Sequence, residues 1–108
     1  MDSFSDSFSA QHHIESNDLV LFVTTTCPFC KMAIEALRQA GYRPTVIVVT
    51  ETIREELYTM TGKTSVPSAW IKGTYIGGCN DGPESWMGVL PCIESGKLKE
   101  MLDADAKL

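Results

Sequence analysis

The residues of this sequence best suited to chemistry are two cysteines separated by two positions, in the segment Cys27-Pro28-Phe29-Cys30. Two thiols at this spacing can close into a disulfide and reopen, contribute to a metal site, or stay inert. An apolar run ends shortly before Cys27, and Pro28 suits the first turn of a helix. We therefore predict that Cys27 lies at a helix N-terminus, where backbone N–H groups stabilise a thiolate.

This position gives the two sulfurs different roles. Cys27 is predicted to be the exposed nucleophile. Cys30, three residues further along the helix, is close enough to form a redox-active disulfide with Cys27 and is predicted to be the less exposed resolving thiol. The alternative is two unreactive cysteines at a helix start.

A second feature is Ser65-Val66-Pro67, which precedes a predicted strand. A cis peptide bond before Pro67 would leave the backbone N–H and C=O of Val66 available to pair with an extended peptide. From the sequence alone, a trans proline at the first position of a strand is the commoner case.

A third feature is the stretch Gly77-Gly78-Cys79-Asn80-Asp81. Paired glycines allow the backbone to approach a ligand closely. Asp81 could hold an ammonium group, but the pattern alone favours Asn80 and Asp81 as caps of the next helix.

Apolar runs and helical periodicity predict the elements that position these motifs. Residues 19–23 and 45–49 are predicted to be buried strands, and a helix follows each of them, the second over about 51–61. Residues 68–76 form a short hairpin, and one or two helices continue to about residue 103. A helix between two strands implies a parallel pair, so the fold class is α/β, with a four-stranded mixed sheet flanked by helices.

Length and charge limit the function classes. The chain has 108 residues and a net charge of -5, which suits one domain. Residues 1–17 are predicted to be an acidic, Ser-rich, disordered tail before a domain over 18–108. Without the acids of residues 1–18 the charge is near neutral, which argues against nucleic-acid binding. With no long apolar run and no recognisable targeting signal, we expect a cytoplasmic monomer that does not bind membranes.

The remaining cysteines allow other interpretations. Cys27, Cys30, Cys79 and Cys92 could form structural disulfides, but no export signal supports this. A protein-only zinc site is disfavoured because Cys79 and Cys92 are too far apart in sequence to form a second close pair. Cys79 and Cys92 could be inert, glutathionylated or bridged to another molecule, and burial without reactivity is the usual state of a cysteine.

Together, these motifs resemble the glutaredoxins. The resemblance runs from about Asp18 to Leu102 and is strongest up to Asp81. It implies a thioredoxin-like fold, a cis Pro67 and glutathione-dependent reduction of protein–glutathione mixed disulfides and protein disulfides through Cys27 and Cys30. It also implies no metal and no tightly bound cofactor. Glutathione or a related small thiol would be the co-substrate, and glutathionylated proteins the partners.

The resemblance further implies a glutathione site. The Val66 backbone would pair with the cysteinyl part, and the Asn80 backbone and Asp81 carboxylate would hold the γ-glutamyl end. Arg54 aligns near the glycyl carboxylate. The full set of expected glutathione-binding residues is Arg54, Ser65, Val66, Pro67, Cys79, Asn80 and Asp81.

Three departures from the family pattern affect this expectation. Thr24 stands where the family usually has a lysine, Ser65 replaces the usual threonine, and residues 82–88 resemble an insertion, in which Trp86 is expected to pack rather than bind. The alternative within the family is an iron–sulfur cluster ligated by Cys27 and glutathione, which the stiff Pro28 disfavours. A thioredoxin-like reductant and a redox-regulated binding protein are further alternatives.

Overall fold

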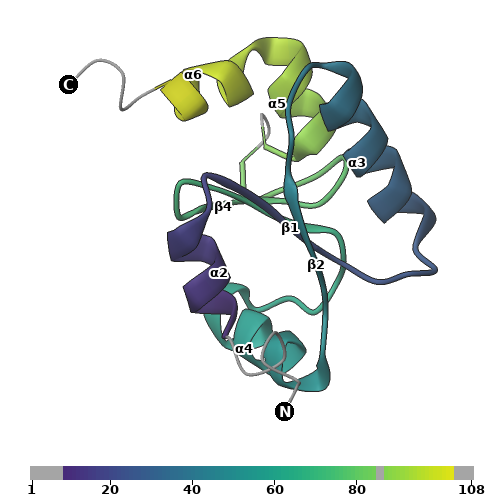
Figure 1. The fold of residues 1–108 in the computed structure, drawn as a ribbon, viewed down its shortest axis with the longest axis vertical. Coiled ribbons are helices and arrows are strands. Elements are labelled where there is room, and N and C mark those ends of the chain that lie inside the picture. The colour runs from purple at the N-terminus through teal and green to yellow at the C-terminus, as the bar shows by residue number, and fades with distance from the viewer. Residues whose placement is uncertain (1–8, 85–86, 104–108) are drawn as a thin grey trace.

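The computed structural model describes residues 9–84 and 87–103. The predicted four-stranded mixed sheet with flanking helices is confirmed (Figure 1). Its strand order is β2-β1-β3-β4, with β1 parallel to β2 and antiparallel to β3, and β3 antiparallel to β4. In chain order the elements are α2 (Ala10–Ser16), β1 (Leu19–Val23), α3 (Pro28–Gln39), β2 (Thr45–Val48), α4 (Glu51–Thr61), β3 (Ser68–Ile71), β4 (Thr74–Gly77), α5 (Val89–Ser95) and α6 (Lys97–Asp103).

The helices cover both faces of the sheet. In Figure 1, α2 and α4 lie together below the sheet, while α3, α5 and α6 lie above it. Strand β1 serves both layers because successive side chains of a strand point to opposite faces. Leu21 packs into the core under α3, whereas Val20 and Phe22 pack into the core beside α4. β1 is therefore buried along its whole length, as predicted.

The first helix was not expected, since the sequence assigns residues 10–16 to a disordered tail. In the structure they form α2, and Ala10 and Ile14 are buried against the core beside α4. The backbone N–H groups of Ala10 and Gln11 donate to the Glu56 carboxylate at 2.7 and 3.1 Å. A carboxylate at a helix N-terminus satisfies otherwise unpaired N–H groups. Ser9 is the local N-cap and accepts from the His12 N–H at 3.1 Å, but the Glu56 carboxylate comes from α4, so the local sequence could not reveal that contact.

The burial predicted for the second strand was also wrong. β2 is an edge strand, so Thr45, Val46 and Ile47 are only half-buried and Val48 is 53% exposed. The apolar sequence of this strand resembles that of β1, but only β1 has a neighbour on each side.

Local signals placed the ends of several elements correctly. Thr50 accepts a hydrogen bond from the N–H of Ile53 at 3.2 Å and begins α4, and Gly62, in a left-handed conformation, ends it. Lys72 and Gly73 both have positive φ, as a two-residue hairpin turn requires. Within the described residues, no helix is long and apolar enough to cross a bilayer.

Candidate functional site

The dithiol lies where the central strand leads into α3. Cys27 is the N-cap of this helix, and its Sγ accepts a hydrogen bond from the backbone N–H of Cys30 at 3.2 Å. Serine, threonine, asparagine or aspartate usually fills this role. Pro28 occupies the first turn and needs no N–H partner there. The N-terminal dipole of α3 is thus directed at the Cys27 sulfur and stabilises negative charge on it.

Cys30 has a different environment in the same turn. Its side chain is only 1% exposed, whereas that of Cys27 is half-buried. Burial raises the pKa of the Cys30 thiol to about 12, and its hydrogen bond with Cys27 contributes to the rise. Cys30 therefore keeps its proton at neutral pH.

The third strand brings Val66 next to the dithiol. The Cys27 thiol donates to the carbonyl oxygen of Val66, with a sulfur–oxygen distance of 3.8 Å. The peptide bond between Val66 and Pro67 is cis, as the family resemblance implied and as the sequence alone did not favour.

A cleft of about 220 Å³ opens beside Val66. Of the residues predicted to bind glutathione, the structure brings six together here: Ser65, Val66, Pro67, Cys79, Asn80 and Asp81. Arg54 is not among the lining residues. Its Nη1 donates to the backbone carbonyl of Thr64 at 3.4 Å, and Thr64 directly precedes the cleft residue Ser65.

Phe29 and Gly78 also line the cleft. The sequence analysis placed Gly78 in a glycine pair suited to a ligand, but it counted neither residue among those that bind glutathione. Phe29 is 53% exposed although it is a large apolar residue. Phe29 lies between the two cysteines, in the first turn of a helix that buries another apolar face in the core. This position is the sequence signal that could have identified it.

The loop after β4 forms the other wall of the cleft. The N–H of Gly78 donates to the carbonyl of Asp81 at 2.7 Å, which folds the loop back on itself. A Cβ on Gly77 would collide with the Asp81 carbonyl, and one on Gly78 would lie 3.4 Å from the carbonyl oxygen of Pro67. The two glycines thus bring this loop against the Pro67 segment.

The prediction that Asn80 and Asp81 cap the next helix is wrong. Helix α5 begins only at Val89, after Gly88, which provides no side-chain cap. Asn80 and Asp81 are exposed at the cleft instead. Part of the predicted insertion, including Trp86, lies outside the described residues.

The other two cysteines are buried. Cys79 is 3% exposed and Cys92 is fully buried, and both belong to the core that also contains Cys30. Burial raises the pKa of both thiols, and the nearby Cys27 adds to the rise at Cys79. No group of three or more histidine, cysteine or acidic side chains suited to a metal ion occurs in residues 9–84 and 87–103.

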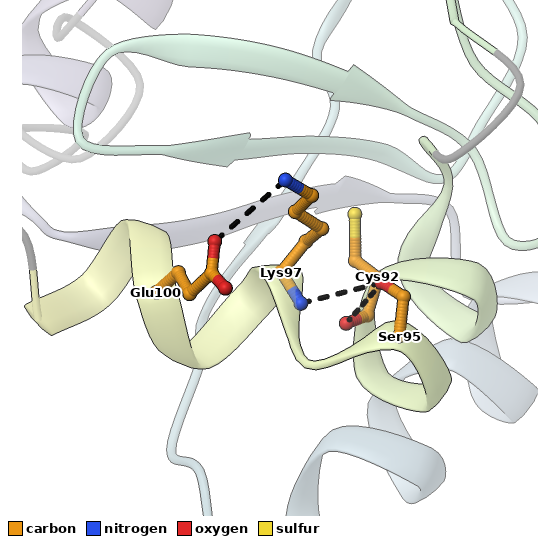
Figure 2. Close-up of polar contacts among 4 residues, drawn as sticks. All are labelled: Cys92, Ser95, Lys97 and Glu100. Atoms are coloured by element: carbon orange, nitrogen blue, oxygen red, sulfur yellow. Dashed lines mark hydrogen bonds and ion pairs between the residues drawn. The ribbon is translucent and has the colours of Figure 1, made fainter.

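Figure 2 shows how Cys92 is held at the junction of α5 and α6. Its carbonyl accepts from the Ser95 hydroxyl at 3.4 Å, and the Lys97 N–H donates to the same hydroxyl at 3.3 Å. The Lys97 ammonium lies 3.7 Å from the Glu100 carboxylate. The Cys92 sulfur points away from these contacts, which agrees with its place in the core (Figure 2).

Known proteins share both this sequence pattern and this fold. A family model described as Glutaredoxin matches residues 19–76. Glutaredoxin-1 of Rhizophagus irregularis is 29% identical over 96 residues, which cover 84% of this chain and 88% of that protein. The glutaredoxin of Pseudomonas aeruginosa is 33% identical over 89 residues, covering 80% of this chain and 96% of that protein.

Solved structures agree with the sequence matches. The crystal structure of a buckwheat glutaredoxin–glutathione complex has a TM-score of 0.76 and 32% identity, and the match covers 90% of this chain and 86% of that one. The four-stranded mixed sheet and its helices are thus those of the thioredoxin-like fold. The family model covers more than half of the chain, and the helix-capping thiol, the buried second thiol and the adjacent cleft agree with it. This chain therefore belongs to the glutaredoxin family of thiol–disulfide oxidoreductases.

Proposed function

We propose that this protein uses glutathione to reduce protein–glutathione mixed disulfides and protein disulfides through the Cys27–Cys30 dithiol. The observation that carries the proposal is the contrast within one helical turn. Cys27 is half-buried and caps α3, whereas Cys30 is buried and has a pKa of about 12.

The first step is attack by the Cys27 thiolate on the glutathione sulfur of a mixed disulfide. A Cys27–glutathione disulfide forms, the original S–S bond breaks, and the protein thiolate leaves with the electron pair and takes a proton from water. A second glutathione thiolate then attacks the bound glutathione sulfur. This releases oxidised glutathione and restores the Cys27 thiolate.

Cys30 provides the second route. After losing its proton it attacks Cys27, forms the Cys27–Cys30 disulfide and expels the thiol bound there. This step is required when the substrate is a disulfide within one protein, because the first attack leaves the substrate covalently attached to Cys27. Glutathione then reduces the internal disulfide in two successive exchanges.

The cleft supplies groups suited to glutathione. The Val66 backbone can pair with the cysteinyl part of the tripeptide, and the exposed Asp81 carboxylate can bind the ammonium of its γ-glutamyl end. Arg54, beside the cleft, is the proposed partner of the glycyl carboxylate. The buckwheat relative crystallised with glutathione supports this assignment. Since Thr24 replaces the usual lysine, we expect weaker binding of the tripeptide's carboxylates.

The test is exposure of the reduced protein to oxidised glutathione, followed by mass spectrometry with peptide mapping. The wild-type protein should contain an internal Cys27–Cys30 disulfide. The Cys30→Ser variant should instead carry one glutathione on Cys27, because the resolving thiol is missing. Modification of Cys79 or Cys92 with an unmodified Cys27 would contradict the proposal.

Two controls separate the alternatives. Stoichiometric iron and visible colour in freshly isolated protein would favour the cluster-binding alternative. Turnover with thioredoxin reductase but not with glutathione would indicate a thioredoxin-like reductant. The proposed function predicts colourless protein and turnover that depends on glutathione.

A further inference from the structure

The edge of the sheet at β2 is open. Within the described residues, β2 pairs with β1 on one side and has no strand on the other, and it runs between the end of α3 and the start of α4 (Figure 1). The N–H of Val49 donates to the Val23 carbonyl of β1 at 2.9 Å. Because backbone groups alternate in direction along a strand, those of Ile47 also face β1. The N–H and C=O groups of Val46 and Val48 therefore point away from the sheet.

Apart from its short length and the preceding Pro44, this edge has few of the features that usually prevent pairing with another chain. Residues 45–49 contain no charged side chain, proline or glycine, and Val48 is 53% exposed. The opposite edge differs, because the Gly88 N–H donates to the Ile76 carbonyl of β4 at 2.6 Å and a loop covers that strand. The open edge is thus specific to β2.

We propose that β2 pairs antiparallel with β2 of a second copy of this chain, across a twofold axis at Ile47. In this register Val46 lies opposite Val48 of the second copy. Both residues direct their backbone groups outward, so each such pair exchanges two hydrogen bonds. Their side chains share one face, and the exposed Val48 becomes covered by Val46 of the second copy.

The residues that flank β2 favour this register. With Ile47 opposite itself, Arg43 of one copy lies opposite Glu51 of the other. Both side chains are exposed and neither forms an ion pair within the described residues. Arg43 also lines a pocket of about 500 Å³ with Arg38, so Glu51 of the second copy would approach two guanidinium groups. Because of the twofold axis, the Arg43–Glu51 contact occurs twice in the dimer.

The backbone at the ends of the strand is compatible too. Pro44 lies opposite Thr50 of the second copy and has no N–H to donate. The Thr50 carbonyl does not need one, because it already accepts from the Arg54 N–H at 2.9 Å. The Thr50 N–H is then free to donate to the Pro44 carbonyl. Within residues 43–51 no like charges lie opposite each other in this register. The proposal departs from the expectation of a monomer.

The first test measures the mass of the full reduced chain in solution over a concentration series, with a thiol reductant present to exclude disulfide-linked dimers. A short strand contact gives a weak dimer, so concentrations up to about 500 µM are needed. We expect a reversible shift from monomer to dimer. A monomer at every concentration would overturn the proposal.

Val48→Lys places a charge opposite the apolar Val46 of the second copy and diagonally across from its own symmetry mate, and it should raise the dissociation constant at least about tenfold. Val48 is largely exposed, so the monomer should still fold and keep its turnover. The matched control is Tyr58→Lys, because Tyr58 is 57% exposed but lies on α4, away from the edge. Equal effects of the two substitutions would contradict pairing through β2.

A charge exchange tests the register. Arg43→Glu and Glu51→Arg should each weaken the dimer, because each brings like charges together across the axis. The double variant should restore wild-type association, since both ion pairs are then re-formed with reversed polarity. A double variant weaker than either single variant would exclude this register.

Amide hydrogen exchange provides an internal control within β2. The Val46 and Val48 amides should exchange slowly at high protein concentration and quickly after dilution. The Ile47 amide, which faces β1, should be protected at both concentrations. Val46 and Val48 amides whose exchange does not depend on concentration would overturn the proposal, even if dimers form through another surface.

Discussion

The two pairs of cysteines contact one hydrophobic core from different places. Cys27 and Cys30 lie in the first turn of α3, whereas Cys79 lies in the loop after β4 and Cys92 in α5. Cys27 is half-buried and the other three are buried. The Cys27 sulfur also receives the dipole of a helix N-terminus, through the Cys30 N–H. The four thiols thus differ in exposure and in polar contacts because of where the backbone places each of them, although all belong to the same residue type.

The largest expected effect is that of Cys27→Ser. Reduction of a small glutathione mixed disulfide should fall by at least about a thousandfold, because a serine hydroxyl does not ionise near neutral pH. A coupled assay of glutathione oxidation measures the loss. Cys92→Ser is the matched control and should retain turnover. Activity that survives in Cys27→Ser would show that the nucleophile lies elsewhere.

Cys30→Ser should affect the two kinds of substrate differently. Reduction of the glutathione mixed disulfide should stay close to the wild-type rate, since a second glutathione can resolve the Cys27 adduct. Reduction of a disulfide within one protein should be lost, because the substrate stays attached to Cys27. Both rates can be measured on the same preparation. Parallel loss of both would mean that Cys30 supports the site in another way.

The raised pKa of Cys30 predicts a loss of stability at alkaline pH. Burial is the main cause that raises this pKa from an ordinary value of 9.0 to about 12. The unfolded chain therefore loses this proton more readily than the folded one. The contribution of the protonated Cys30 thiol to the free energy of unfolding is fully present below pH 9.0 and is lost as the pH rises towards 12. Denaturant unfolding of the reduced protein at several pH values measures the fall. The fall should be smaller in Cys30→Ala, and an equal one would assign the effect to other groups.

The smallest expected effect concerns Cys92. Cys92→Ala removes a fully buried sulfur and should lower the free energy of unfolding by about 1 kcal/mol, without changing turnover. Denaturant titration together with the coupled assay checks both expectations. Lost turnover at unchanged stability would mean that Cys92 takes part in the chemistry, and the contrast between the two pairs would then fail.

Local patterns allowed much of this site to be predicted. A helix start at Pro28 with Cys27 as its cap depends on neighbouring residues alone, as do the Thr50 cap and the hairpin turn at Lys72 and Gly73. These signals act over a few residues, so the sequence displays them directly.

Three predictions failed because they depended on distant residues. Helix α2 has a local cap in Ser9, but the core that buries Ala10 and Ile14 and the Glu56 carboxylate that binds its first N–H groups come from distant parts of the chain. Asn80 and Asp81 line the cleft and do not cap a helix, because the loop folds back towards Pro67. A run of apolar residues such as Val46–Val49 indicates a strand, but strand order decides whether it lies at the centre or at the edge of a sheet.

The sequence by itself therefore determined which cysteine caps α3, because capping and helix direction are local properties of the backbone. Only the tertiary structure decided which residues form the cleft, since Val66 and Asp81 meet through the packing of β3 and β4. It also left Val48 exposed at an edge while the similar residues of β1 are buried. Burial depends on neighbours, and for a strand in a mixed sheet those neighbours come from distant parts of the chain.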